Sequence, residues 1–210
     1  MTIDERARQV ICHGSCRVAG HQTSAPPLTA WPGQLGLLLG SDWRVITNGI
    51  GSLSIRELDA QAVSTVDGLL TPDYSLNVLL LDELTCTLAA HDLGSVVSET
   101  IADLRCYCAN RRAAAEARGA NLKIGVMLCP AGSPNQRELL RREINAVLLL
   151  VGAQSLGCDL LWGSDLMTSH DAYKSHELYN ADALHPSEVG HVHIARAAYE
   201  AVRNLESMAC

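Results

Sequence analysis

The chain has 210 residues, 48% of them hydrophobic and 19% charged, which is enough for one globular domain with a sizeable core. Sixteen basic and 23 acidic residues give a formal net charge of −7, so the overall field disfavours nucleic acid as a partner. Apolar stretches stay shorter than the roughly 20 residues that span a bilayer, and the N-terminus lacks the basic-then-apolar order of a secretory signal. We therefore expect a single domain over residues 1–210, located in the cytoplasm and without a membrane contact.

Short apolar runs that are typical of strands buried on both faces alternate with longer helical patterns. The predicted strands are Arg8–His13, Trp43–Thr47, Leu76–Leu81, Leu122–Cys129 and Cys158–Trp162. The predicted helices are Pro32–Leu39, Ser54–Leu69, Leu93–Arg118, Pro134–Leu156 and a last one from Pro186 to about Glu206. This alternation predicts an α/β fold, a three-layer α/β/α sandwich around a five-stranded parallel sheet.

Open parallel sheets bind their ligands at the carboxyl ends of the strands. There, Ser15 follows the first predicted strand, and Gly14 before it suits a sharp turn, so the hydroxyl would project above the sheet edge. An ordinary turn would carry the same two residues, and the chain has no G-x-S-x-G nucleophile elbow. Two segments without a regular pattern, His21–Ala30 and Ser164–Leu184, are rich in small or polar residues.

The segment Asp182-Ala183-Leu184-His185-Pro186 places a carboxylate three residues before an imidazole. The two side chains can meet across one tight turn, and the proline suits the first turn of the helix that follows. An aspartate bonded to one ring nitrogen fixes the tautomer and leaves the other nitrogen able to accept a proton. The structural alternative is a helix start that Asp182 merely caps.

Taken together, these features resemble the SGNH or GDSL-type hydrolases, which place a catalytic serine after the first strand and an Asp-x-x-His pair near the C-terminus. The resemblance covers nearly the whole chain. His13-Gly14-Ser15-Cys16 resembles the family's Gly-Asp-Ser-Leu block, and Trp31-Pro32 with Leu35 and Leu38 resembles its first helix. Val45 to Ser52 resembles the oxyanion block, and Pro72-Asp73 resembles the approach to the Gly-x-Asn-Asp block. Asp182, His185, Pro186 and Gly190 match the last block.

The resemblance implies a flavodoxin-like SGNH-hydrolase fold and a serine esterase acting on small acyl or acetyl esters, with carbohydrate-linked esters among the candidates. Ser15 would attack and form an acyl-enzyme, His185 would relay the proton, and Asp182 would orient His185. Backbone N–H groups of Ser15 and of Gly51 or Ser52 would hold the oxyanion. The implied partner is a small-molecule ester, with no cofactor and no metal ion.

Four positions depart from the family pattern. Gly14 stands where the family has an aspartate, and Ser52 falls on the glycine of the oxyanion block, with Gly51 one register away. The Asn and Asp of the Gly-x-Asn-Asp block fall on Asp82 and Glu83. An ionised Asp82 would repel the oxyanion, and the loss of one donor typically costs about a hundred- to a thousandfold in turnover. Three explanations stay open: a protonated Asp82 that donates, a nearby hydroxyl such as Thr85, or a protein that is not a conventional hydrolase. A non-hydrolytic ligand-binding protein and an O-acyltransferase are therefore the alternative functions.

Eight cysteines are expected to stay as thiols in a reducing compartment. The pairs Cys12 and Cys16, and Cys106 and Cys108, lack the spacing of a zinc site. Cys16 is a neighbour of Ser15, and we expect it to pack near the site without attacking the substrate.

Two further histidines and two tryptophans have plainer interpretations. His191 and His193 lie two apart in a predicted helix, point to different sides, and therefore do not predict a metal site. Trp31 and Trp162 are expected in the core, although they could also line a pocket.

Overall fold

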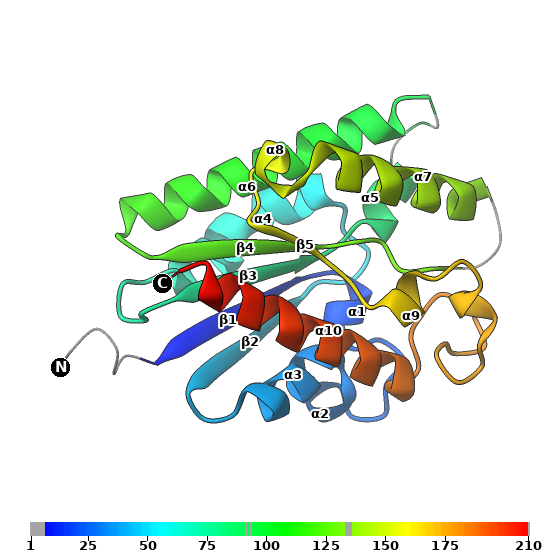
Figure 1. Ribbon diagram of the computed structural model, residues 1–210, viewed down its shortest axis with the longest axis horizontal. Helices are drawn as coiled ribbons and strands as arrows, with labels where there is room; N and C mark the ends of the chain where they lie inside the picture. Colours follow the sequence, from blue (N-terminus) through cyan, green and yellow to red (C-terminus); the bar gives the residue numbers. More distant parts are fainter. Residues whose placement is uncertain (1–6, 91, 93, 133–135, 210) are drawn as a thin grey trace.

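The computed structural model describes residues 7–90, 92, 94–132 and 136–209. All five strands are parallel and lie in the order β2-β1-β3-β4-β5, which confirms the predicted sheet and its flavodoxin-like winding (Figure 1). The strands are β1 (Arg8–Gly14), β2 (Trp43–Gly49), β3 (Asn77–Asp82), β4 (Leu122–Met127) and β5 (Leu160–Trp162). The starts predicted for two helices, Leu93 and Pro134, lie outside the described residues.

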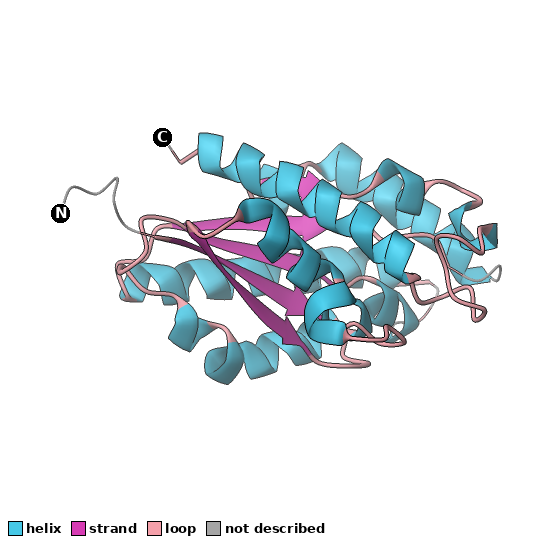
Figure 2. Cartoon of the chain, turned by 90° about the horizontal axis from the view of Figure 1, so that it is seen from below, coloured by secondary structure: helices cyan, strands magenta, loops and turns pink. Residues whose placement is uncertain are grey.

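Helices cover both faces of the sheet, which confirms the three-layer sandwich (Figures 1 and 2). One face carries α2 (Pro26–Thr29), α3 (Trp31–Leu39) and α10 (Glu188–Ser207). The opposite face carries α4 (Ile55–Thr65), α6 (Val96–Ala117), α7 (Gln136–Val151) and α8 (Ala153–Leu156). Shorter elements complete the chain: α1 (Cys16–Ala19), η2 (Asp67–Leu69), α5 (Thr85–Ala90), α9 (Asp165–Thr168) and η3 (Ala172–Lys174).

Two apolar clusters hold these layers together, one on each face of the sheet. Because successive side chains of a strand point to opposite faces, Ile11 and Leu79 pack toward α6 while Val10 and Val78 pack toward α10. All four side chains have no exposed surface. This two-sided burial explains why the strands read as continuous apolar runs in the sequence.

The helix predicted over residues 134–156 is two helices in the structure. Gly152 separates α7 from α8 with a φ of 78°, a conformation that side-chain-bearing residues rarely adopt. The segments predicted to be irregular also contain short helical turns, namely α2 in the first and α9 and η3 in the second. Their few residues carry too little periodicity to be recognised from the sequence.

The last helix begins at Glu188 and not at Pro186. The hydroxyl of Ser187 accepts a hydrogen bond from the backbone N–H of Gly190 at 3.1 Å, so Ser187 is the N-cap. Pro186 lies before this cap and forms an isolated antiparallel bridge with Tyr179. The bridge fixes the loop that leads into α10.

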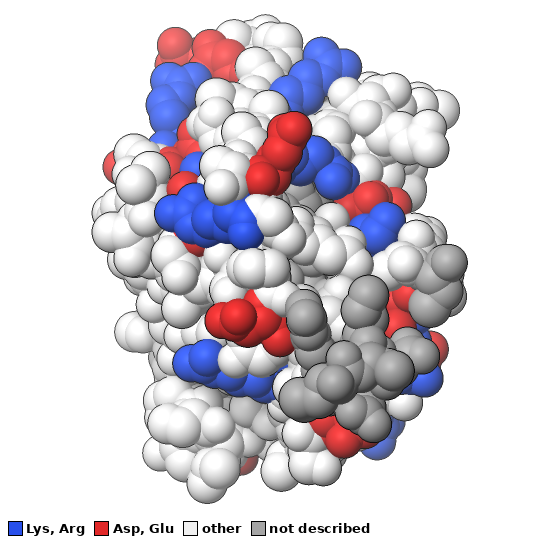
Figure 3. All heavy atoms as spheres, turned by 90° about the vertical axis from the view of Figure 1, so that its left-hand side faces the viewer, with Lys and Arg blue, Asp and Glu red and all other residues white. Residues whose placement is uncertain are grey.

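Basic and acidic side chains alternate on the face at the left of Figure 1, and the described part of that face shows no large patch of one sign (Figure 3). None of the helices in the described part of the chain is both long and apolar enough to cross a bilayer.

Candidate active site

The carboxyl ends of β1, β2 and β3 lie side by side at one edge of the sheet. Gly14, the last residue of β1, is in register with Gly49 of β2 and with Asp82 of β3. A Cβ at Gly14 would lie 2.2 Å from the backbone oxygen of Asp82, so only glycine fits there. The backbone at Gly14 therefore contacts β3 where β1 ends, and Ser15 and Cys16 follow at the carboxyl edge of the sheet.

Asp182 and His185 contact each other, as their spacing predicts. The His185 Nδ1 atom lies 2.6 Å from Asp182 Oδ2, and Asp182 Oδ1 accepts the backbone N–H groups of Leu184 and His185, both at 3.0 Å. Ala183 makes this tight turn with a φ of 53°. Although partial burial opposes it, these hydrogen bonds from His185 and Leu184 lower the pKa of Asp182 to about 2. The carboxylate is therefore ionised at neutral pH and fixes the orientation of the ring.

The start of the irregular segment His21–Ala30 also contacts this pair, a contact that the sequence did not predict. Gln22 donates from Nε2 to Asp182 Oδ2 at 2.9 Å, and the rings of His21 and His185 lie 4.8 Å apart between centroids. Gln22 has a φ of 64°, a strained value that turns its side chain toward the loop before α10. These contacts join positions 160 or more residues apart in the chain, which no local pattern reveals.

Ser15 and Cys16 occupy different surroundings. Ser15 has no exposed surface, and it lies near the buried side chain of Glu83 and near Cys86. Cys16 is half-buried, and its thiol lies close enough to His185 for each group to shift the pKa of the other. The Ser15 Oγ lies 3.8 Å from the Cys16 Sγ, so both side chains belong to the same turn. The thiol that the sequence assigned to packing is therefore electrostatically coupled to the imidazole.

The protonation equilibria of Cys16 and His185 are coupled. Burial opposes ionisation of the thiol, but the hydrogen bond from His185 and the charge of Arg17 outweigh it and lower the pKa of Cys16. Conversely, the hydrogen bond with Cys16 and then that with Asp182 raise the pKa of His185 despite burial of the ring. Both shifts favour a thiolate beside an imidazolium.

Asp82, predicted at the oxyanion site, has contacts that do not fit a donor. Its Oδ1 accepts from Arg17 Nε at 3.0 Å and Nη2 at 2.7 Å, and its Oδ2 accepts from Trp31 Nε1 at 3.0 Å. Asp82 has no exposed surface and the Arg17 side chain is only 4% exposed, so this is a buried ion pair. Arg17 also donates to Thr85 Oγ1 at 2.7 Å. With both oxygens accepting, Asp82 serves as the counter-ion of Arg17.

The turn after β2 provides the other predicted oxyanion residues. Gly51 and Ser52 are exposed, and Ser52 has a φ of 63°. The preceding residue, Ile50, donates its N–H to the backbone oxygen of Gly14 at 2.8 Å, which ties this turn to the end of β1. Within the described residues, the N–H groups of Gly51 and Ser52 make no hydrogen bond and can serve a ligand.

The remaining candidates of the sequence lie in the packing around the site. His191 is fully buried, and its Nδ1 accepts the backbone N–H of Trp31 at 3.2 Å. Burial, with the nearby charge of Arg17 adding to it, lowers the pKa of His191 to about 4, so the ring is neutral at pH 7. Trp31 and Trp162 pack edge to face in the core, with ring centroids 5.8 Å apart. Among the described residues no cluster of His, Cys, Asp and Glu could hold a metal ion.

A cavity of about 310 Å³ opens beside the Asp182 turn. Asp182 and Leu184 line one side of it, and Arg17 also borders it. The other lining side chains are mostly small or apolar, among them Cys86, Leu88, Ala89, Pro130 and Ala131. The charged side chains that line the cavity are paired: Arg17 with Asp82, Arg141 with Glu138 and Asp182 with His185, so the cavity suits an uncharged group.

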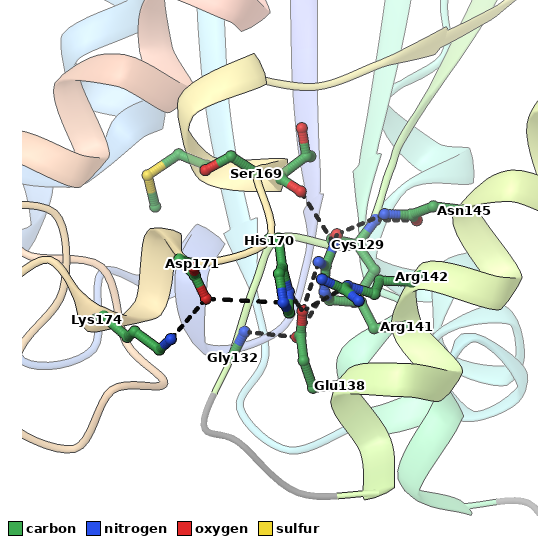
Figure 4. Close-up of polar contacts among 12 residues, drawn as sticks. Cys129, Gly132, Glu138, Arg141, Arg142, Asn145, Ser169, His170, Asp171 and Lys174 are labelled. Atoms are coloured by element: carbon green, nitrogen blue, oxygen red, sulfur yellow. Dashed lines mark hydrogen bonds and ion pairs between the residues drawn. The ribbon is translucent and has the colours of Figure 1, made fainter.

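A polar network behind this cavity fixes the loop that follows β4 (Figure 4). Glu138 and Arg141 form a buried bidentate ion pair, with both nitrogen to oxygen distances at 2.7 Å. Arg141 and Asn145 donate to the backbone oxygen of Cys129 at 3.1 and 2.9 Å, and Gly132 donates its N–H to Glu138 at 3.4 Å. The described part of this loop, residues 128–132, is thereby held at one side of the cavity.

No protein-family model and no curated protein sequence matches the chain. Among solved structures, an aryl esterase from M. smegmatis is similar at 16% identity, with a TM-score of 0.71 over 95% of this chain and all of the other. A carbohydrate acetylesterase from Sinorhizobium meliloti is similar at 13% identity and a TM-score of 0.70, over 94% of this chain and 99% of the other. A lipolytic protein of the G-D-S-L family from Veillonella parvula is similar at 17% identity and a TM-score of 0.65, over 95% of this chain and all of the other. The chain has a GDSL-type hydrolase fold. At these identities the likeness establishes the fold, and the roles of single side chains rest on their geometry.

The GDSL-type fold also explains why the sequence pointed to Ser15. The Gly-Asp-Ser-Leu block was matched to His13 onward, but His13 lies fully buried within β1, with Nδ1 2.5 Å from the hydroxyl of Tyr107. The glycine at the end of the strand is Gly14, whose contact with β3 excludes any side chain. Matching the block from Gly14 puts Ser15 on the aspartate position and Cys16 on the serine position. The prediction of Ser15 rests on the first of these two registers, and the second differs from it by one residue.

Proposed function

We propose that the protein is an ester-hydrolysing enzyme that works through a covalent acyl intermediate at the carboxyl edge of the sheet. The observation that carries this proposal is the Asp182 and His185 pair, joined at 2.6 Å and directed at the turn after β1. That turn holds two possible nucleophiles, the Ser15 hydroxyl named by the sequence and the Cys16 thiol that contacts the ring. The esterases among the structurally similar proteins support this class of reaction.

Each residue has a defined task in this reaction. His185 moves protons between the nucleophile, the leaving group and water, and Asp182 holds its Nδ1 side so that the opposite nitrogen faces the turn. Backbone N–H groups of the β1–α1 turn and of Gly51 and Ser52 would stabilise the negative oxygen of the tetrahedral intermediate. The cavity beside Asp182 and Leu184 would take the acyl group, which favours small, uncharged acyl chains.

The test uses p-nitrophenyl acetate with the purified protein and with His185→Ala. We expect saturable turnover by the wild type and a loss of about 10²–10⁴-fold in kcat/KM for His185→Ala. His176→Ala is the matched control, since His176 is exposed, and its kcat/KM should stay within about twofold of the wild type. If the wild type shows no saturable turnover, or if the two variants are equally active, the proposal is contradicted and a ligand-binding protein is favoured.

Acyl transfer to an alcohol would use the same side chains. The two reactions are separated by measuring the free acid and the new ester that form when an alcohol is added. If the protein is a hydrolase, free acid remains the main product at low alcohol concentration; if it is an acyltransferase, the new ester is the main product.

A further inference from the structure

The turn after β1 offers two adjacent side chains that could attack a carbonyl carbon, and the structure treats them differently. Ser15 is completely buried, whereas Cys16, whose Sγ lies 3.8 Å from the Ser15 Oγ, is partly accessible. The Asp182 and His185 pair is held beside the same turn, because Asp182 accepts from Gln22 and the His185 ring packs on that of His21. We infer that the nucleophile is the Cys16 thiol and that the acyl intermediate is a thioester on Cys16. This inference rests on the proposed ester-hydrolysing function and names its attacking atom.

The geometry around His185 supports the assignment. Nδ1 faces Asp182, so Nε2 is the nitrogen left to exchange a proton with a nucleophile, and the Cys16 thiol is near enough to this ring to raise its pKa. Nucleophile, base and orienting carboxylate then form one continuous chain of contacts. Ser15 is less suited to this role, because its side chain has no exposed surface and a substrate carbonyl would have to displace the turn to reach it.

Electrostatics favours the same atom. An unperturbed thiol has a pKa of about 8.5 and is only a few per cent ionised at pH 7. Burial of Cys16 opposes ionisation, yet the contact with His185 and the charge of Arg17 lower the pKa of this thiol overall. The Arg17 guanidinium is fixed by its buried pairing with Asp82, so this positive charge is held in place beside the thiol. Asp82 thus acts on the nucleophile indirectly, as a positioning residue.

The reaction balances without a further reagent. The Cys16 thiolate forms a bond to the carbonyl carbon, the tetrahedral intermediate expels the alcohol oxygen, and that oxygen takes the proton of the His185 imidazolium. Water then gives a proton to His185 and attacks the thioester carbon, and the carbon–sulfur bond breaks. The thiolate and imidazolium are restored, and one ester and one water have become one acid and one alcohol.

A thiol nucleophile also narrows the substrate class. The tetrahedral intermediate can expel either the thiolate or the leaving oxygen, and the weaker base leaves faster. An alkoxide, with a conjugate acid near the pKa of about 16 found for water, competes poorly with a thiolate. We therefore expect aryl esters and thioesters, whose leaving groups are weak bases, to be preferred over simple alkyl esters.

The experiment compares Cys16→Ala and Ser15→Ala in turnover of phenyl acetate, with Cys106→Ser as control. Cys106 is an exposed thiol on α6, outside the site, so Cys106→Ser should keep the wild-type rate. We expect Cys16→Ala to lower kcat/KM by on the order of a thousandfold or more. Ser15→Ala should stay within about tenfold of the wild type, because it removes a hydroxyl that does not contact His185. Thermal unfolding of each variant shows whether it is folded.

A second readout detects the thioester directly. Intact-mass analysis after a brief reaction with phenyl acetate should show an acetyl adduct that neutral hydroxylamine removes and that Cys16→Ala lacks. An adduct retained in folded Cys16→Ala and lost in folded Ser15→Ala would overturn the assignment of Cys16 while leaving the ester-hydrolysing function intact.

Alkylation by iodoacetamide separates the two claims. If the wild type does not hydrolyse esters but Cys16 is alkylated at pH 6 much faster than Cys106, the proposed function fails and the activated thiol stands. If Cys16 reacts no faster than Cys106 and no adduct forms, the inference is wrong as well. Comparing kcat/KM for phenyl acetate, a thioester and ethyl acetate tests the leaving-group preference, which equal values would contradict.

Discussion

Replacement of Asp82 by asparagine distinguishes the two roles that this residue could have. In the structure Asp82 is the buried counter-ion of Arg17, with two hydrogen bonds to Oδ1 and a third, from Trp31, to Oδ2. Asp82→Asn keeps the volume but removes the charge and leaves the guanidinium without its main partner. Breaking one side of a buried ion pair typically costs about 3–5 kcal/mol. Glu83 is also close enough to Arg17 to favour its charge, so we expect the lower part of this range.

For a chain of this length, 1 kcal/mol shifts Tm by about 2–4 °C, so a loss of about 3 kcal/mol lowers Tm by about 6–12 °C. Thermal unfolding followed by circular dichroism at pH 7 measures this change. Asp42→Asn is the matched control, because Asp42 is exposed and its replacement should change stability by no more than about 0.5 kcal/mol. The oxyanion hypothesis predicts instead that Asp82→Asn supplies a donor and raises ester turnover by about a hundred- to a thousandfold. A gain of that size, or a Tm equal to that of the control, would refute the ion-pair account.

Other predictions follow from the same edge of the sheet. Gly14→Ala would place a Cβ 2.2 Å from a backbone oxygen and should cost about 1–3 kcal/mol or more, whereas Gly51→Ala, with nothing within 4 Å of its Cβ, should be nearly neutral in chemical denaturation. The folded-state pKa of Asp182, about 2, lies below the unfolded value of about 3.9, so its stabilising contribution is present above pH 4 and lost as the pH falls toward 2. The difference in Tm between wild type and Asp182→Asn should therefore shrink between pH 5 and pH 2, and a constant difference would contradict the pairing. Ser187→Ala removes the N-cap of α10 and should cost about 0.5–2 kcal/mol, with an unchanged urea midpoint as the contrary result.

The fold was predictable because its determinants are local. Short apolar runs such as Val78–Leu81 are typical of strands with both faces covered, and their alternation with helical patterns favours one common architecture. The contact between Asp182 and His185 was predictable for the same reason, since three residues separate them in one turn. The break at Gly152 and the caps of short helices depend on single residues, so the sequence did not predict them.

The nucleophile and its surroundings depend on tertiary contacts. Ser15 and Cys16 are adjacent and both are chemically suitable, so only the close approach of Gly14 to β3 sets the register of the turn. The pairing of Arg17 with Asp82 joins positions 65 residues apart and turns an apparent oxyanion residue into a counter-ion. Patterns of single residues do not contain this information.

The thiol and the imidazole enter the site from opposite ends of the sequence, separated by about 170 residues. Since β1 lies in the interior of the sheet between β2 and β3, the turn that bears Cys16 is placed only when non-local strand pairing is in place. His185 arrives on the loop before α10, which packs on that same sheet. In a partly folded chain Cys16 is therefore an ordinary thiol. Its reactivity toward an alkylating reagent, followed during refolding, would report when strand pairing and the docking of the loop before α10 are both complete.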